Sequence, residues 1–144
     1  MILLDTNVIS EPFRTTASPA VLAWLDAQLA ETLYLSTITL AEIRFGIAAL
    51  PDGKRRSVLK QRFEERILPA FADRILSFDM AATISYAAIR TRAKAAGLAI
   101  GVADGYIAAI AAARGLAVAT RDDGPFRAAG LTVINPWVPA GNPS

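Results

Sequence analysis

Short apolar runs alternate along the chain with longer stretches of helical periodicity. Runs rich in Leu, Ile, Val and Ala, each expected to form a strand, cover residues 2–4, 33–36, 74–77, 116–119 and 131–134. Helical spacing of apolar residues fits residues 7–13, 18–29, 38–50, 54–70, 79–96 and 102–114. Strands that alternate with helices pair in parallel, with helices on both faces of the sheet. The pattern therefore predicts an α/β fold, in which a central parallel sheet of about five strands lies between two helical layers.

Turn-forming residues support these boundaries. Ser18 and Pro19 begin a helix, residues 51–53 (Pro-Asp-Gly) separate two helices, and three glycines follow helical segments at positions 97, 115 and 130. No stretch has the composition of an interdomain linker, a repeat or a low-complexity segment. We therefore expect residues 1–138 to form a single domain, followed by a loose tail over residues 139–144.

Composition limits the chemistry that the chain can perform. Its 144 residues include no His and no Cys, which excludes an imidazole base, a thiolate nucleophile and the usual zinc ligands. The net charge of +2 permits a nucleic-acid partner without indicating one strongly. No apolar run reaches the roughly 18 residues of a membrane span, and the first run is too short for a signal peptide. We expect a soluble cytoplasmic protein that has no contact with a membrane.

Four acidic residues recur in similar local settings: Asp5, Glu42, Asp104 and Asp122. Three of them lie where an apolar run ends or a helical pattern begins. The carboxyl ends of parallel strands form the ligand crevice of such sheets, so carboxylates from distant parts of the chain can meet there. Clustered carboxylates repel one another, and an all-oxygen cluster suits Mg²⁺ or Mn²⁺.

Each of these carboxylates also has a purely structural interpretation. Asp5 can cap the helix that starts near residue 7, and Asp104 can offset the dipole of the helix whose first turn it occupies. Glu42 lies three residues after Thr39, which is the spacing of a capping box. Asp122 can cap a short helix that leads into Phe126. No single one of the four decides between a structural and a catalytic role.

Taken together, the four motifs resemble the PIN-domain ribonucleases of the VapC toxin family, in the branch of FitB-like proteins. The first motif is Asp5-Thr6-Asn7 after an apolar strand, and the second is Ser36 with residues 39–42 (Thr-Leu-Ala-Glu) and Gly46. The third is residues 102–104 (Val-Ala-Asp) with 107–109 (Ile-Ala-Ala), and the fourth is residues 119–122 (Ala-Thr-Arg-Asp) ahead of Phe126. Four motifs in the family's order across about 120 residues are a far more specific signal than any one of them.

The resemblance implies a PIN fold and the activity of a toxin in a type II toxin–antitoxin system. The implied activity is endonucleolytic hydrolysis of RNA by a metal-activated water, which leaves 5′-phosphate and 3′-hydroxyl ends. The implied cofactor is Mg²⁺ or Mn²⁺, held directly or through water by Asp5, Glu42, Asp104 and Asp122. Thr6, Asn7 and Thr120 are implied to orient these ligands or to hold the water; capping and turn roles are the structural alternative for these three.

The chain departs from the family pattern at the fourth motif. Many relatives carry another acidic residue just before the Phe, where this chain has Pro125, whereas Asp122 and Asp123 are adjacent here. We expect Asp122 to face the site and Asp123 to point away from it in the following turn.

Basic residues gather on the helix predicted over residues 54–70. Lys54, Arg55, Arg56, Lys60 and Arg62, with Arg66 beyond them, can follow a sugar-phosphate backbone. The alternative is a solvated face on which residues such as Arg62 pair with acidic neighbours. The aromatic residues Trp24, Phe45, Tyr86 and Tyr106 are expected to lie in the core.

The resemblance also implies partners: a homodimer, and a cognate antitoxin of the VapB or FitA type that blocks the acidic groove with an Arg. Operator DNA would be bound only through the antitoxin. Two alternative functions stay open, namely a catalytically silent PIN-like scaffold and a Mg²⁺-binding receiver module of phosphosignalling. A receiver requires a Lys at the end of a late strand, and none of Lys54, Lys60 and Lys94 has that position.

Overall fold

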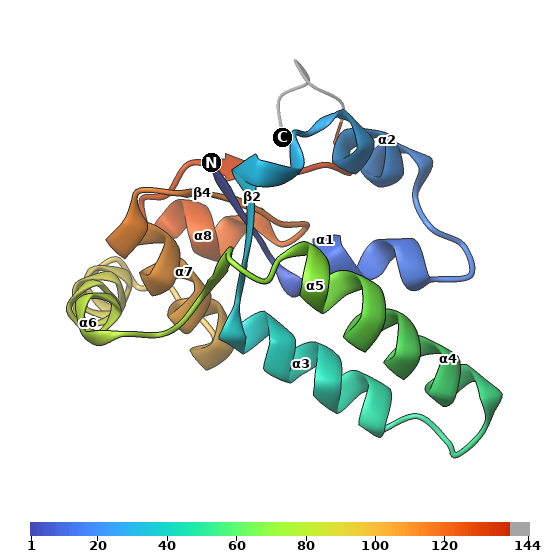
Figure 1. Ribbon diagram of the computed structural model, residues 1–144. Coiled ribbons are helices and arrows are strands. Elements are labelled where there is room, and N and C mark those ends of the chain that lie inside the picture. The colour runs from blue at the N-terminus through green and yellow to red at the C-terminus, as the bar shows by residue number, and fades with distance from the viewer. Residues whose placement is uncertain (139–144) are drawn as a thin grey trace.

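The computed structural model describes residues 1–138, and the predicted loose tail lies outside the described residues. Five strands form one parallel sheet in the order β3-β2-β1-β4-β5, of which Figure 1 labels β2 and β4. The strands are β1 (Ile2–Leu4), β2 (Leu33–Ser36), β3 (Ile75–Leu76), β4 (Ala117–Ala119) and β5 (Val133–Ile134). The predicted parallel sheet of five strands is confirmed.

Strand β1 lies at the centre of the sheet. Leu3 pairs with Tyr34 of β2 on one side and with Val118 of β4 on the other. Of these two neighbours, β2 is the next strand along the chain after β1, whereas β4 comes only after β3. The carboxyl ends of β1 and β4 form the point at which the strand order reverses, where ligands bind in open α/β sheets.

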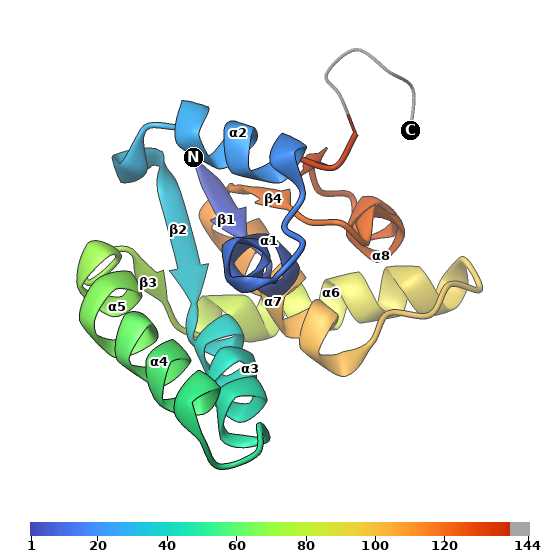
Figure 2. The ribbon, with the colours of Figure 1, turned by 90° about the vertical axis from the view of Figure 1, so that its right-hand side faces the viewer.

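Helices cover both faces of this sheet (Figures 1 and 2). The first half of the chain supplies α1 (Thr6–Ser10), α2 (Pro19–Ala27), α3 (Thr37–Ala48), α4 (Lys54–Arg62) and α5 (Leu68–Ala70), with 3-10 turns η1 (Glu11–Phe13) and η2 (Ala30–Thr32) and a π-helical turn η3 (Phe63–Ile67). The second half supplies α6 (Met80–Ala95), α7 (Val102–Arg114) and α8 (Asp123–Ala128). This arrangement is the predicted three-layer α/β/α architecture.

Two apolar cores form because successive residues of a strand point to opposite faces of the sheet. Leu3 and Val118 are buried against α6, α7 and α8, whereas the next residues, Leu4 and Ala119, are buried against α1 and α2. Both faces of the strands are thus covered, as the near-continuous apolar runs of the sequence require. Full burial of a side chain such as Leu3 stabilises the fold by about 2 kcal/mol.

The elements differ from the predicted ones mainly at their ends. The three later strands are each shorter than the predicted runs 74–77, 116–119 and 131–134. The helix predicted over residues 54–70 is interrupted by the π-helical turn at Phe63–Ile67. The helix predicted over residues 7–13 becomes a 3-10 turn at Glu11–Phe13, which contains Pro12. Proline has no backbone N–H, which explains why the α-helical hydrogen-bond pattern ends there.

Two glycines have clear structural reasons. Gly115 ends α7 in the left-handed region, with φ of +67°, which an L side chain rarely adopts. A Cβ at Gly105 would lie 3.1 Å from Cε2 of Tyr86, so the glycine allows α7 to pack closely on α6. Gly105 therefore has a packing role, and its neighbour Tyr106 joins Phe78 and Tyr86 in an aromatic cluster.

The predicted core position of one aromatic residue is wrong. Phe45 is 75% exposed on α3, whereas Trp24 and Tyr86 pack against the two cores as expected. Phe45 lies on the exposed side of α3 with its helical neighbour Ala41, whereas Ile43 and Ile47 of this helix are partly buried. Within residues 1–138, no helix combines the length and the apolar character needed to span a membrane.

Candidate active site

Asp5 joins the two central strands at their carboxyl ends. It directly follows β1, and its backbone N–H donates to the carbonyl of Ala119 at 2.9 Å. Its Oδ1 accepts from the N–H of Thr6 at 2.8 Å, and its Oδ2 accepts from Oγ1 of Thr120 at 2.9 Å. The predicted capping role of Asp5 is confirmed, and the second oxygen is held by the end of β4.

Burial raises the pKa of Asp5 to about 6, because the charged form loses hydration. The hydrogen bonds from Thr120 and Thr6 oppose this effect, and the negative charges of Asp104 and Glu42 add to it. Asp5 therefore lies within the electrostatic reach of two further acidic residues that come from distant parts of the chain.

Glu42 is positioned by Thr6 and not by a capping box. Helix α3 begins at Thr37 and is capped by Ser36, whose Oγ accepts from the N–H of Thr39 at 3.1 Å. The capping-box interpretation of Thr39 and Glu42 is therefore wrong, because both residues lie inside the helix. Instead, Thr6 Oγ1 donates to Oε1 of Glu42 at 2.8 Å.

A buried hydroxyl supports this contact. Oγ1 of Thr39 lies 3.2 Å from Oγ1 of Thr6, and Thr39 is fully buried. A hydroxyl has a single proton, so Thr6 accepts from Thr39 while it donates to Glu42. The three side chains form a chain that fixes the direction of the Thr6 proton.

Asp104 and Asp122 complete the acidic group. Asp104 lies in the first turn of α7, as predicted; burial and the nearby charges of Asp122 and Glu42 raise its pKa. Asp122 precedes α8, but its side chain makes no capping hydrogen bond. The neighbouring Asp123 belongs to α8 and pairs with Nε of Arg127 at 3.7 Å. Of the two adjacent acids, Asp122 is the one whose charge acts on Asp104.

The three polar residues expected to assist the carboxylates make different contacts. Thr6 contacts Glu42, and Thr120 contacts Asp5 while also accepting from the N–H of Asp122 at 3.1 Å. Within residues 1–138 Asn7 forms no hydrogen bond with a carboxylate; its Oδ1 accepts from the backbone N–H of Arg121 at 3.3 Å. Asn7 thus fixes the loop after β4.

The donor set fits a hydrated hard cation. All four side chains offer carboxylate oxygens, which Mg²⁺ and Mn²⁺ prefer. Within residues 1–138, however, no three acidic side chains are placed closely enough to enclose an ion. Mg²⁺ commonly binds through one or two carboxylates and keeps several water molecules, so the arrangement suits an ion that some carboxylates reach through water.

Comparison with known proteins assigns the family. The family model described as PIN domain matches residues 2–131. The chain belongs to the PIN-domain family. VapC ribonuclease Y4jK of Sinorhizobium fredii is 60% identical over 140 residues, which cover 97% of this chain and 100% of that protein. Toxin FitB of Neisseria gonorrhoeae is 56% identical over 137 residues, which cover 95% and 99%. A solved structure of FitAB bound to an IR36 DNA fragment has a TM-score of 0.94 and 54% identity, and the match covers 96% of each chain.

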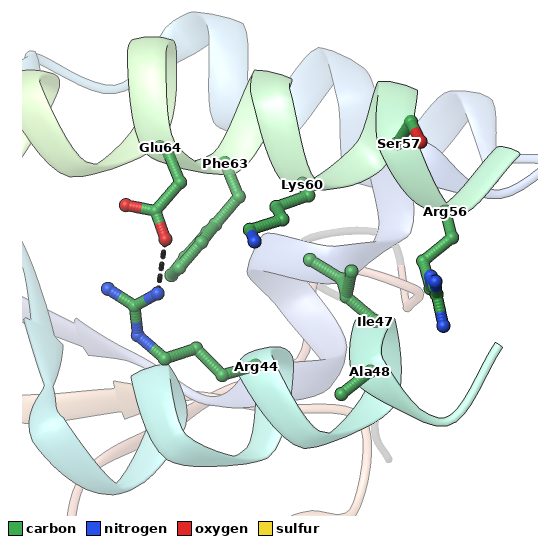
Figure 3. Close-up of a pocket in the computed structure, with 8 residues that line it drawn as sticks. All are labelled: Arg44, Ile47, Ala48, Arg56, Ser57, Lys60, Phe63 and Glu64. Atoms are coloured by element: carbon green, nitrogen blue, oxygen red, sulfur yellow. Dashed lines mark hydrogen bonds and ion pairs between the residues drawn. The ribbon is translucent and has the colours of Figure 1, made fainter. Parts of the chain in front are cut away.

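The basic residues of this PIN domain do not form one surface. Arg55 lines a groove of about 380 Å³ that also reaches Thr6 and Glu42. Arg56 and Lys60 line a separate hollow of about 440 Å³ between α3 and α4, to which none of the four acidic residues contributes (Figure 3). Arg55 therefore lies on a different side of α4 from Arg56 and Lys60, although all three are close in sequence.

The ion pairs that this basic helix forms also differ from the predicted ones. Arg62 stacks over the ring of Phe13, with Cζ 4.7 Å from the ring centroid, and forms no ion pair within residues 1–138. Glu64 pairs with Arg44 of α3 (Figure 3), and Arg56 pairs with Asp52 at 2.7 Å. The predicted pairing with an acidic neighbour is therefore found for Arg56 but not for Arg62, although Arg62 is exposed as a solvated face requires.

Sequence reasoning missed three residues near the acidic group of the PIN domain. The sequence places Thr39 in the second motif but does not predict its contact with Thr6, and Arg14 lines the groove beside Glu42, where the buried Glu11 holds it at 3.2 Å. Arg121 lies inside the fourth motif, but no role followed from its sequence position. Its only sequence signal is its place between Thr120 and Asp122.

Proposed function

We propose that this chain is the toxin of a type II toxin–antitoxin system and acts as a Mg²⁺- or Mn²⁺-dependent endoribonuclease. The observation that carries the proposal is the convergence of Asp5, Glu42, Asp104 and Asp122 from four separate elements, at distances where their charges raise pKa values. The chain has neither His nor Cys, so carboxylates are the groups left to organise hydrolysis. The names of its relatives, VapC ribonuclease and Toxin FitB, support the same activity.

The metal would be held by these four carboxylates, some of them through water. When bound, it offsets the negative charge of the phosphodiester and lowers the pKa of a water molecule that attacks phosphorus. A metal would also favour the ionised form of Asp5, whose pKa burial raises to about 6. A single cofactor would thus supply the chemistry that imidazole or thiol groups supply elsewhere.

The protein's own residues orient the ligands. Thr120 donates to Oδ2 of Asp5, and Thr6 donates to Oε1 of Glu42. Each bond fixes one carboxylate oxygen, and the remaining lone pairs of the group would be available to a bound cation or its waters. Such orientation lowers the cost of assembling the site when the substrate arrives.

The groove beside Glu42 is the site that we propose for a cognate antitoxin. It is lined by Thr6 and Glu42 and by apolar side chains such as Phe13, Ile43 and Leu59. An extended or helical segment with apolar side chains would fill it, and an Arg would pair with the carboxylates in place of the metal. FitAB, a solved relative, is a complex bound to DNA. We propose that any contact of this protein with operator DNA is made through the antitoxin.

We propose a cytoplasmic homodimer as the active form. Phe45 on α3 and Met80 and Ile84 on α6 are 75%, 83% and 75% exposed, and an interface between two copies would remove this apolar area from water. The receiver-type alternative lacks its lysine, since Lys54 and Lys60 lie on α4 and Lys94 lies on α6. The silent-scaffold alternative differs from a nuclease in its response to metal and RNA.

RNA cleavage by the purified protein tests the proposal. We expect Mg²⁺- or Mn²⁺-dependent cleavage that produces new 5′-phosphate ends and is lost in Asp104→Asn, which removes a charge at constant volume. Asp123→Asn is the matched control, because it removes the adjacent acid that pairs with Arg127. A folded Asp104→Asn protein that cleaves at the wild-type rate would overturn the proposal, and so would a wild-type protein whose melting temperature ignores divalent metal and which cleaves no RNA.

A further inference from the structure

Arg121 brings a positive charge to the rim of the acidic site. It lies between Thr120, which donates to Asp5, and Asp122, whose charge acts on Asp104. Its side chain is exposed. A cation in this place lies where RNA must approach, because the carboxylates on their own repel a phosphate.

The backbone of Arg121 is held from both sides. Its N–H donates to Oδ1 of Asn7 at 3.3 Å, and its carbonyl accepts from Nδ2 of Asn135 at 3.3 Å. These bonds join the loop after β4 to α1 and to the segment after β5. The Cα of Arg121 therefore has a fixed position relative to the carboxylates on either side of it.

The side chain of Arg121 stacks on an aromatic ring. Its Cζ lies 5.2 Å from the ring centroid of Trp137. Trp137 is partly buried against the core, and its backbone N–H donates to Oδ1 of Asn135 at 3.0 Å. Among residues 1–138, no carboxylate forms an ion pair with Arg121, although Asp122 is its direct neighbour. Arg127 and Asp123, by contrast, pair four residues apart.

Stacking of this kind leaves the guanidinium able to bind an anion. A cation over an indole ring is attracted by the π face of the ring, and a guanidinium held in this way keeps a fork of N–H donors that matches phosphate. An Arg whose task was to neutralise Asp122 would pair with that carboxylate directly. The stack on Trp137 instead holds the charge beside the acidic group, and among residues 1–138 no side-chain hydrogen bond or ion pair engages its donors.

We propose that Arg121, held against Trp137, binds a phosphate of the RNA backbone next to the scissile bond and so positions the substrate over the carboxylates. This inference rests on the proposed ribonuclease function. It makes Arg121 a substrate-binding residue and Trp137 the residue that positions it. Loss of the charge then weakens RNA binding without changing the carboxylates.

RNA binding measured without cleavage is the direct test. In the Asp104→Asn background, affinity for a short single-stranded RNA is measured at several salt concentrations, with and without Arg121→Met. We expect affinity to fall roughly 10-fold, as for loss of one charged hydrogen-bonded contact. The slope of log affinity against log salt is expected to shrink by about 0.7, the value for one phosphate contact on a single strand.

The matched control is Arg114→Met. Arg114 occupies the other end of α7 from Asp104 and forms a half-exposed pair with Asp79 at 3.4 Å. The substitution Arg114→Met removes the same charge from the same residue type. An equal loss of RNA affinity in Arg114→Met would show that only net charge matters and would overturn the inference. An unchanged salt slope in Arg121→Met would overturn it as well.

Cleavage kinetics separate this inference from the proposed function. If the wild-type protein cleaves RNA and Arg121→Met does so with the same KM, the inference fails while the ribonuclease proposal stands. If the wild-type protein cleaves no RNA, the proposed function itself fails. Trp137→Phe keeps an aromatic face and is expected to raise KM less than Arg121→Met. Arg121→Lys keeps the charge and is expected to bind RNA with an intermediate affinity, because a lysine lacks the planar fork.

Discussion

Thr6 on α1 donates its hydroxyl proton to Glu42 on α3 at 2.8 Å, and this bond joins the first acidic motif of the chain to the second. Oγ1 of the buried Thr39 lies 3.2 Å from that of Thr6, and because the single Thr6 proton goes to the nearer, charged Glu42, Thr6 accepts from Thr39. The geometry of Glu42 therefore depends on two hydroxyl groups that belong to different helices.

Thr6→Val is expected to weaken divalent-metal binding and RNA cleavage roughly 10- to 100-fold, the usual effect of removing a residue that orients a metal ligand. The variant keeps the shape of the side chain and removes only the hydroxyl. Thr6→Ser restores the hydroxyl and is expected to recover most of the activity. Metal titration by thermal melting and initial cleavage rates measure both effects. Equal activity in Thr6→Val and wild type would show that Glu42 needs no such support.

The apo protein is expected to lose stability as pH rises from about 4 to about 6. The pKa of Asp5 is raised from 3.8 to about 6 by burial, so the folded state holds this proton more tightly than the unfolded state. The ionised, buried carboxylate costs up to about 3 kcal/mol once pH exceeds the folded pKa. Urea unfolding at several pH values measures this slope. Asp5→Asn, which has no proton to lose, is expected to flatten it.

Divalent metal is expected to have the opposite pH dependence. Metal requires ionised carboxylates, so the rise in melting temperature on adding Mg²⁺ or Mn²⁺ should be larger at pH 7 than at pH 5. Asp104, whose pKa is also raised by burial, contributes in the same direction. A metal effect that stays constant from pH 5 to pH 7 would show that neither Asp5 nor Asp104 must ionise to bind the ion.

Asp122→Asn is expected to weaken metal binding or cleavage severalfold, less than Asp104→Asn, and Asp123→Asn is expected to be nearly silent. Asp122 has no capping bond and acts electrostatically on Asp104, whereas Asp123 pairs with Arg127 inside α8. Amides at this position occur in many members of the family that the sequence resembles, which is why the loss should be partial. Kinetics on the three variants measure the order. A larger loss in Asp123→Asn would reverse the assignment.

Gly46→Leu is expected to block the antitoxin without damaging the fold. Gly46 lines the groove beside Glu42, and a Cβ placed there meets no atom within 4 Å. Replacing a mid-helix glycine also favours the helix, by about 1 kcal/mol. Gly46→Ala is the control, because it gains the helical stability and leaves most of the groove open. The affinity for the co-expressed antitoxin is the measurement, and unchanged binding by a folded Gly46→Leu protein would place the antitoxin elsewhere.

Local pattern determined the elements of this protein. Apolar runs and helical spacing gave the five strands and the main helices, because residues that face a core must repeat with the period of the element that carries them. The absence of His and Cys and the positions of Asp5 and Asp104 after a strand and at a helix start were also readable from the sequence. These features depend on neighbours along the chain.

Tertiary structure alone decided what those elements bring together. The bond between Thr120 and Asp5 spans 115 positions, and the bond between Thr6 and Glu42 spans 36, so no local pattern contains either. The same holds for the stack of Arg121 on Trp137. Arg55 and Arg56 are adjacent on one predicted helix, yet they line different cavities, because α3 packs against α4 and contributes residues to both cavities. The separation of two residues in sequence does not specify their distance in space, which is set by how the elements pack.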